Sequence, residues 1–129
     1  MTEKREATVL LVDRSDIGRE IIARFVRLKL PTLQVHTADS LTAAVEYCIS
    51  SRVDIVIIDL GSNEQLNSQY VNDIRLTNDQ IKFILVTSRG DLEEIPDFSC
   101  DENCTVARIP LDLRELLVIL NKLVLVVEE

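Results

Sequence analysis

Two acidic residues and one hydroxyl stand where strongly apolar runs of the sequence end. Asp13 follows the run VLLV, Asp59 follows VDIVII, and Thr87 follows FILV. If these runs are strands of one parallel sheet, their carboxyl ends share an edge, and α/β proteins place their ligand crevice outside that edge. Carboxylate oxygens are the ligands that a hard cation prefers. The spacing therefore predicts one polar pocket rather than three separate surface residues.

Five apolar runs are expected to form the strands that position these residues. We place the strands at residues 7–13, 33–39, 53–60, 81–88 and 104–109. The third run has no polar alternation over VIID, which is typical of a strand buried on both faces of a parallel sheet. The second run is only weakly apolar, so we expect this strand at an edge of the sheet.

Apolar residues at helical spacing follow the first strand. Ser15 or Asp16 can cap this helix, and Pro31 ends it. One face is expected to carry the apolar side chains, with Glu20 and Arg24 paired four residues apart outside it. The residues of that face are Ile17, Ile21, Phe25 and Leu28.

Three more helical segments are expected. Ser40 caps the second helix, whose apolar stripe is Leu41, Ala44, Val45, Cys48 and Ile49, so Cys48 is expected in the core. A short helix is expected at 70–76 and a long one at 111–127. Residues 89–103 are polar and contain Pro96, which predicts at most a short or irregular helix there.

These elements alternate as five β/α units, which predicts one α/β domain over residues 1–129. The right-handed crossover rule places helices on both faces of a parallel sheet. We therefore predict a flavodoxin-like (βα)5 three-layer sandwich with strand order 2-1-3-4-5. In that order the first and third strands are neighbours, so Asp13 and Asp59 face each other.

Charge and composition exclude several classes of function. The net charge is −8 and the pI is near 4.6, which argues against nucleic-acid binding because that binding neutralises phosphates with Lys and Arg. No run reaches the roughly 18 apolar residues of a membrane span, and no signal peptide is visible. Three cysteines fit a reducing, cytoplasmic compartment. The single His36 has no second imidazole with which to share a metal, so we expect a structural or surface role.

With these residues in place, the chain resembles response-regulator receiver domains (CheY-like domains), the phosphoacceptor modules of two-component, or phosphorelay, signal transduction. The stretches that carry the resemblance are LLVD ending at Asp13, DIVIIDL with Asp59, ILVTSRGD with Thr87, and IPLDLREL with Pro110. It covers nearly the whole chain, in the right order and spacing.

The resemblance implies a role for each pocket residue. Asp59 would be the phosphoacceptor, taking its phosphoryl group from a sensor histidine kinase or a phosphotransfer protein. Asp13, Asp59 and the Gly61 carbonyl would hold Mg²⁺, and Thr87 would bond a phosphoryl oxygen. Phosphorylation would then control an output or partner through the last strand and helix. The peptide bond between Ile109 and Pro110 is expected to be cis.

The chain departs from the family pattern at several pocket positions. The second acid after the first strand is Arg14, which implies that Mg²⁺ binding is weak or lost. The lysine before the last proline is Ile109, and alternation along the strand should point the adjacent Arg108 away. The aromatic switch residue is Val106. We hypothesise that the Arg14 guanidinium lies near Asp13 and Asp59 and supplies the missing positive charge.

Two functions remain open from these residues. One is a phosphorylatable receiver, favoured by Asp13, Asp59 and Thr87. The other is an atypical pseudo-receiver, a phosphorylation-independent interaction or dimerisation module, favoured by Arg14 and Ile109. An enzyme on the same fold is not expected. The chain lacks the Asp-x-Asp motif of haloacid-dehalogenase-like phosphatases and the phosphate-binding loop of flavodoxins.

The last helix is unusually apolar for its position. Its sheet-facing residues are expected to be Leu113, Leu116, Leu117, Leu120, Leu123, Val124 and Val127. Val118 and Leu125 should then face solvent, and exposed apolar residues in register predict a partner surface. Because receiver domains often dimerise here, we expect a homodimer through this helix. Cys100 and Cys104 are either a metal or redox pair or two ordinary cysteines.

Overall fold

Five apolar strands pair into one parallel sheet in the computed structural model, which describes residues 6–61, 68–87 and 103–127. They are β1 (Thr8–Val12), β2 (Gln34–Ala38), β3 (Ile55–Gly61), β4 (Lys82–Thr87) and β5 (Cys104–Arg108). Their order is β2-β1-β3-β4-β5. This confirms the predicted order, the edge position of β2 and the flavodoxin-like α/β fold.

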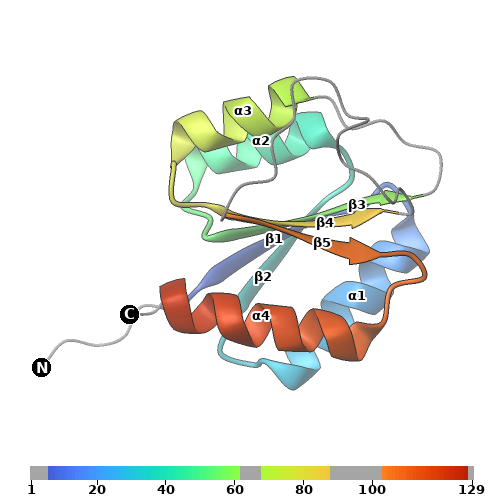
Figure 1. Ribbon diagram of the computed structural model, residues 1–129. Helices are drawn as coiled ribbons and strands as arrows, with labels where there is room; N and C mark the ends of the chain where they lie inside the picture. Colours follow the sequence, from blue (N-terminus) through green and yellow to red (C-terminus); the bar gives the residue numbers. More distant parts are fainter. Residues whose placement is uncertain (1–5, 62–67, 88–102, 128–129) are drawn as a thin grey trace, which may run out of the picture.

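Helices cover both faces of the sheet. In the described residues they are α1 (Asp16–Lys29), α2 (Leu41–Ser50), α3 (Ser68–Thr77) and α4 (Leu113–Val127). Figure 1 shows α1 and α4 on one face and α2 and α3 on the other, so the molecule has three layers. The irregular segment expected after β4 lies almost wholly outside the described residues. None of the described helices has the length and apolar character needed to cross a membrane.

Serine side chains start the first two helices, as the sequence predicts. The Ser15 hydroxyl accepts a hydrogen bond from the Gly18 amide at 3.1 Å, so Ser15 rather than Asp16 is the cap of α1. The Ser40 hydroxyl accepts from the Ala43 amide, also at 3.1 Å. Such caps satisfy amide groups that have no partner within the helix.

The apolar face expected for α1 is wrong. Ile17, Ile21 and Leu28 are exposed, and Phe25 is only half-buried. The helix instead turns a second set of positions toward the sheet, namely Arg19, Ile22, Ala23 and Val26. These four have i, i+3, i+4, i+7 spacing, which also places residues on one face of a helix. The Arg19 guanidinium donates to the Asp13 carbonyl at 2.8 Å, which fixes this face against the end of β1.

The other helices follow the prediction more closely. In α2, Ala44 and Cys48 are buried as expected, but Ile49 is exposed. In α4, Leu116 and Leu120 are fully buried, whereas the rest of the expected inward set is half-buried. Val118 and Leu125 are exposed, as predicted, and Val126 is exposed as well.

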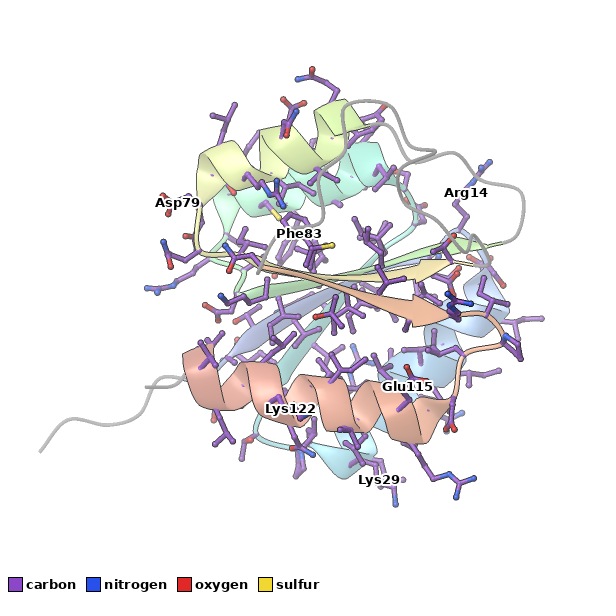
Figure 2. All side chains as sticks on the ribbon, viewed as in Figure 1. Arg14, Lys29, Asp79, Phe83, Glu115 and Lys122 are labelled. Carbon is purple, nitrogen blue, oxygen red and sulfur yellow. The ribbon has the colours of Figure 1, made fainter. Side chains whose placement is uncertain are left out.

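Two apolar layers make the core. One lies between the sheet and α2 and α3 and contains Phe83, whose ring lies between these layers in Figure 2. The other lies between the sheet and α1 and α4 and contains Leu116 and Leu120. Burial raises the pKa of the Cys48 thiol to about 11, as expected for a cysteine that serves as a core side chain.

Candidate functional site

The strand register brings the predicted pocket residues to one edge of the sheet. Val12 pairs with Ile58 in the neighbouring strand, so Asp13 and Asp59, which follow them, lie at the same level of the sheet. On the other side of β3, Asp59 pairs with Val86 and Gly61 pairs with Thr87. All four predicted positions therefore lie at the carboxyl edge, where parallel sheets bind ligands.

An irregularity in β3 sits at this edge. The register with β4 shifts between Asp59 and Gly61, so one extra residue is accommodated in β3. Bulges of this kind bend a strand and redirect its side chains, and they are common beside functional sites. The shift follows Asp59 directly and thereby sets how the chain leaves the sheet after that residue.

Asp13 is buried and turned toward the first turn of α1. Its Oδ1 accepts from the Ser15 amide at 2.9 Å. A Cβ atom at Gly18 would lie 2.8 Å from its Oδ2, so the carboxylate fits only because residue 18 has no side chain. The amide-rich start of a helix stabilises a nearby carboxylate. Asp13 thus holds β1 and α1 together as well as standing at the edge of the site.

Asp59 and Arg14 line one pocket of about 270 Å³. Its remaining walls come from β1, β3, α2 and α3, through Val12, Ser40, Leu41, Thr42, Ile58 and Tyr70. Asp59 is half-buried and Arg14 exposed, and Figure 2 shows the Arg14 side chain at the carboxyl edge of the sheet. Arg14 therefore shares this pocket with Asp59, as the hypothesis requires. Asp13 is not among the residues that line the pocket, so the hypothesis is supported for Asp59 but not for Asp13.

Ile109, which follows β5, is hydrogen-bonded to the end of β4 and packs in the core. The Ile109 amide donates to the Thr87 carbonyl at 3.1 Å, and the Ile109 side chain packs on the core under α1 and α4. The cis peptide bond between Ile109 and Pro110 is confirmed. Thr87 itself is buried.

Arg108 was expected to point away from the pocket, and it is not among the residues that line the pocket, but its register places it on the same face of the sheet as Thr87. It is paired in register with Thr87, and residues opposite each other in neighbouring strands share a face of the sheet. The same holds one step back, where Val86 and Ala107 pair and both pack in the layer under α1 and α4. The exposed Arg108 therefore lies on the face that carries Thr87.

The oxygen donors at this edge fit a magnesium ion poorly. Within the described ranges, no group of three or more His, Cys, Asp or Glu residues is placed to hold a metal. Asp13 Oδ1 is already engaged by the Ser15 amide, and Asp16 pairs with Arg19 at 2.6 Å. Mg²⁺ can bind through one or two carboxylates, but Arg14, which lines the same pocket as Asp59, adds a like charge that works against it.

Several residues at the site were not predicted from the sequence. Gly18 and Arg19 set the position of Asp13, and Thr42 and Tyr70 line the pocket. Gly18 carries a sequence signal, because glycine in the first turn of a helix is unfavourable unless packing requires it. Tyr70 carries none, since only the fold brings α3 beside β1 and β3.

Two further candidate residues, Cys104 and His36, lie away from this edge. Cys104 is buried in the core layer under α2 and α3, and Cys100 lies outside the described residues. His36 lies on the edge strand β2 with its ring centroid 5.2 Å from that of Tyr47, which agrees with a structural role.

Solved receiver-domain structures share this fold. The chemotaxis protein CheY4 of Vibrio cholerae matches with a TM-score of 0.77 at 19% identity, over 92% of this chain and 99% of that one. A response regulator receiver protein from Pseudomonas putida matches with a TM-score of 0.75 at 24% identity, over 93% and 99%. The signal receiver domain of an HD domain-containing protein from Pseudomonas fluorescens Pf-5 matches with a TM-score of 0.70 at 24% identity, over 92% and 94%.

No protein-family model and no curated protein matches the chain. These three structural matches are below 25% identity, so they establish the fold alone: this chain has the CheY-like receiver fold. They leave the chemistry of the pocket to be argued from its own residues.

Proposed function

We propose that this chain is a receiver domain of a two-component system in which Asp59 accepts a phosphoryl group. The observation that carries the proposal is the position of Asp59. It is the last residue of the central strand β3 before the register shift and is half-buried in the wall of a pocket, and Thr87 follows its partner Val86 in β4. The partner that delivers the phosphoryl group is a sensor histidine kinase or a phosphotransfer protein.

The pocket chemistry supports this transfer. A carboxylate oxygen of Asp59 forms the new bond to phosphorus, and the phosphohistidine nitrogen of the donor leaves and takes up a proton. Positive charge aimed at the phosphoryl oxygens stabilises the transition state of such a transfer. Arg14 lines the pocket with Asp59, and we propose that it supplies this charge while Thr87 bonds one phosphoryl oxygen.

We further propose that Mg²⁺ binding is weak. The two carboxylates and the Gly61 carbonyl are the only donors assigned to the ion, and Asp13 Oδ1 is shared with the Ser15 amide. Arg14 stands where a further acid would strengthen the site. No step above is therefore assigned to a metal.

A phosphorylation-independent interaction module is the alternative function. Two observations favour it: the poor fit of the acidic residues to a cation, and the apolar contacts that Ile109 makes in the core. In this alternative the exposed Val118 and Leu125 of α4 serve as the contact surface, and a homodimer through this helix is the simplest assembly. Both functions belong to the cytoplasm, and neither makes the chain an enzyme for a small substrate.

An amide NMR titration separates the two functions. We would add Mg²⁺ and then beryllofluoride, which mimics the aspartyl phosphate, to the native chain and to Asp59→Asn. For a phosphoacceptor, we expect shifts at Asp59, Thr87 and α4 in the native chain and none in the variant. Unchanged spectra of the native chain at millimolar Mg²⁺ would instead support the interaction module.

A further inference from the structure

Large apolar side chains are exposed mainly on the layer formed by α1 and α4. On α1, Ile17, Ile21 and Leu28 are 75%, 53% and 76% exposed. On α4, Val118 and Leu125 are 53% and 69% exposed. Exposed apolar residues gathered on one face mark an interaction surface more often than scattered ones do. The three residues of α1 are the same ones that the sequence pattern had assigned to the core.

The exposed residues of α1 form a stripe opposite its buried face. At 3.6 residues per turn, Ile17, Ile21 and Leu28 lie within a narrow arc on the far side of the helix from Ile22 and Val26. With Arg24 the stripe has spacings of four, three and four residues. This is the spacing by which helices pair along a seam. We call these four residues the α1 seam.

We propose that the α1 seam pairs with the α1 seam of a second copy of this chain, antiparallel and about a two-fold axis. In such an interface one surface meets itself, so a residue and its contact occur twice. If Ile17 faces Leu28 of the second copy, the same register places Ile21 opposite Arg24 of that copy. Apolar side chains then cover both ends of the seam.

The charges beside the seam fit a second copy. Glu20 lies one turn before Arg24 and on the side of the helix that flanks it. In the antiparallel register, Glu20 of each chain comes beside Arg24 of the other, so two opposite-charge contacts form. Arg24 therefore meets a carboxylate and the apolar face of Ile21, rather than only the other arginine. Charge complementarity of this kind fixes register.

The surface is large enough only if α4 takes part. Stable interfaces bury roughly 800 Å² per partner, and a helix of 14 residues, about 21 Å long, offers less than that. The α4 helix contacts α1 and lies beside it on the same face of the sheet (Figure 1). Val118 and Leu125 point away from the buried Leu116 and Leu120, so they extend the surface at the sides. The dimer is expected to be of modest affinity and concentration-dependent.

The association state of the full chain tests this inference, independently of any chemistry at Asp59. Sedimentation equilibrium over a concentration series should show a monomer–dimer equilibrium for the native chain. Leu28→Glu places a carboxylate against Ile17 of the second copy and should weaken dimerisation by at least tenfold. The matched control is Leu76→Glu on α3, because Leu76 is 85% exposed on the opposite face of the sheet, and it should dimerise like the native chain.

A charge swap tests the antiparallel register. Glu20→Arg should weaken the dimer because the introduced guanidinium would meet Arg24 of the second copy. The double variant Glu20→Arg with Arg24→Glu restores opposite charges and should recover most of the affinity. Circular dichroism checks that each variant is folded. Asp59→Asn should dimerise normally, which separates this inference from the proposed phosphoryl transfer.

Three results would overturn the inference. The first is a native chain that stays monomeric at the highest concentration, which would assign the seam to a different partner such as a helix of a phosphotransfer protein. The second is a Leu28→Glu variant that dimerises as well as Leu76→Glu does. The third is a double charge variant that remains as weak as Glu20→Arg alone, because the two chains would then meet in another register.

Discussion

At the scale of single residues, the Asp13 carboxylate anchors the start of α1 and is also a candidate ligand at the pocket edge, and these two roles compete. Its Oδ1 accepts from the Ser15 amide, and its Oδ2 lies where a Cβ at residue 18 would approach to 2.8 Å. Ser15 and Gly18 thus hold the carboxylate against the start of α1. A ligand at the pocket edge must share this carboxylate with the helix. Together with the cation of Arg14, this is why we expect the site to depend less on a metal than its acidic residues alone would indicate.

Cys48 gives a prediction for the dependence of stability on pH. Burial raises the pKa of its thiol from 9.0 to about 11. Below pH 9 the thiol is protonated in both states and adds no pH dependence. Between about pH 9 and 11 it ionises in the unfolded chain but not in the folded one, so this contribution to stability is lost as pH rises.

Urea unfolding of the native chain and of Cys48→Ala across this pH range measures the effect. The other groups that titrate there are common to both proteins, so the difference in their unfolding free energies isolates the thiol. We expect the native chain to lose stability relative to the variant as pH rises from 9 to 11. A difference that stays constant would show that the thiol ionises equally in both states.

At the scale of elements, one buried carboxylate joins two strands at the end of the sheet opposite the pocket. Asp54 accepts from the Thr8 amide at 2.8 Å, and its own amide donates to the Thr8 carbonyl at 2.9 Å. Its side chain therefore extends the hydrogen bonding between β1 and β3. Arg52 lies 3.7 Å from the carboxylate but is mostly exposed.

This arrangement predicts a difference between three substitutions. Asp54→Ala leaves the Thr8 amide without its acceptor and should lower the free energy of unfolding by about 1–3 kcal/mol. Asp54→Asn keeps an acceptor oxygen and should cost less. Arg52→Ala removes an exposed ion pair and should cost less than about 1 kcal/mol. Chemical denaturation measures all three, and a larger loss for Arg52→Ala than for Asp54→Ala would contradict the assignment.

The elements also show what a sequence of this kind can predict. Strand order and the position of Asp59 follow from buried runs and their spacing, because parallel strands with short crossovers have few alternative arrangements. The inward face of α1 could not be predicted in the same way. Ile22, Ala23 and Val26 form one apolar face of the helix, and Ile17, Ile21 and Leu28 form another. On the buried face Arg19 also donates a hydrogen bond to the Asp13 carbonyl, a contact that the apolar pattern does not contain.

The candidate site shows the same contrast between features that the sequence predicts and contacts that it does not. Residues at strand ends were placed correctly at the edge, because the end of a strand is a local feature. The pocket wall contributed by Tyr70 and Thr42 depends on how two helices meet above the sheet. Arg108 was assigned by alternation relative to Ile109, whereas the register with β4 is what places it beside Thr87. Contacts between elements were therefore the part that residue patterns could not supply.

At the scale of the whole molecule, the chain is strongly negative, whereas the pocket that contains Asp59 is also lined by a cation, Arg14. The formal net charge is −8, which favours cations over the entire surface and opposes the approach of a phosphorylated partner. Exposed charges farther apart than about 8–10 Å are largely screened at physiological salt. A change of charge at Arg14 should therefore act on Asp59, while the same change far away should not.

Arg14→Asp and Arg24→Asp make this comparison, because both replace an exposed arginine by an acid and change the net charge equally. Arg14 lines the pocket of Asp59, whereas Arg24 lies on the outer side of α1. We expect Arg14→Asp to tighten Mg²⁺ binding by about tenfold, or about 1.4 kcal/mol, since it removes a like charge and adds an oxygen ligand. Arg24→Asp should leave the affinity within about twofold of native. Titration calorimetry measures the Mg²⁺ affinity of both variants. It is done at about 150 mM salt, the ionic strength to which the screening distance above applies. Equal affinities for the two variants would show that Arg14 does not act on the pocket. The positive charge proposed for phosphoryl transfer would then have to come from another residue. Arg108 is the first candidate, because it pairs in register with Thr87.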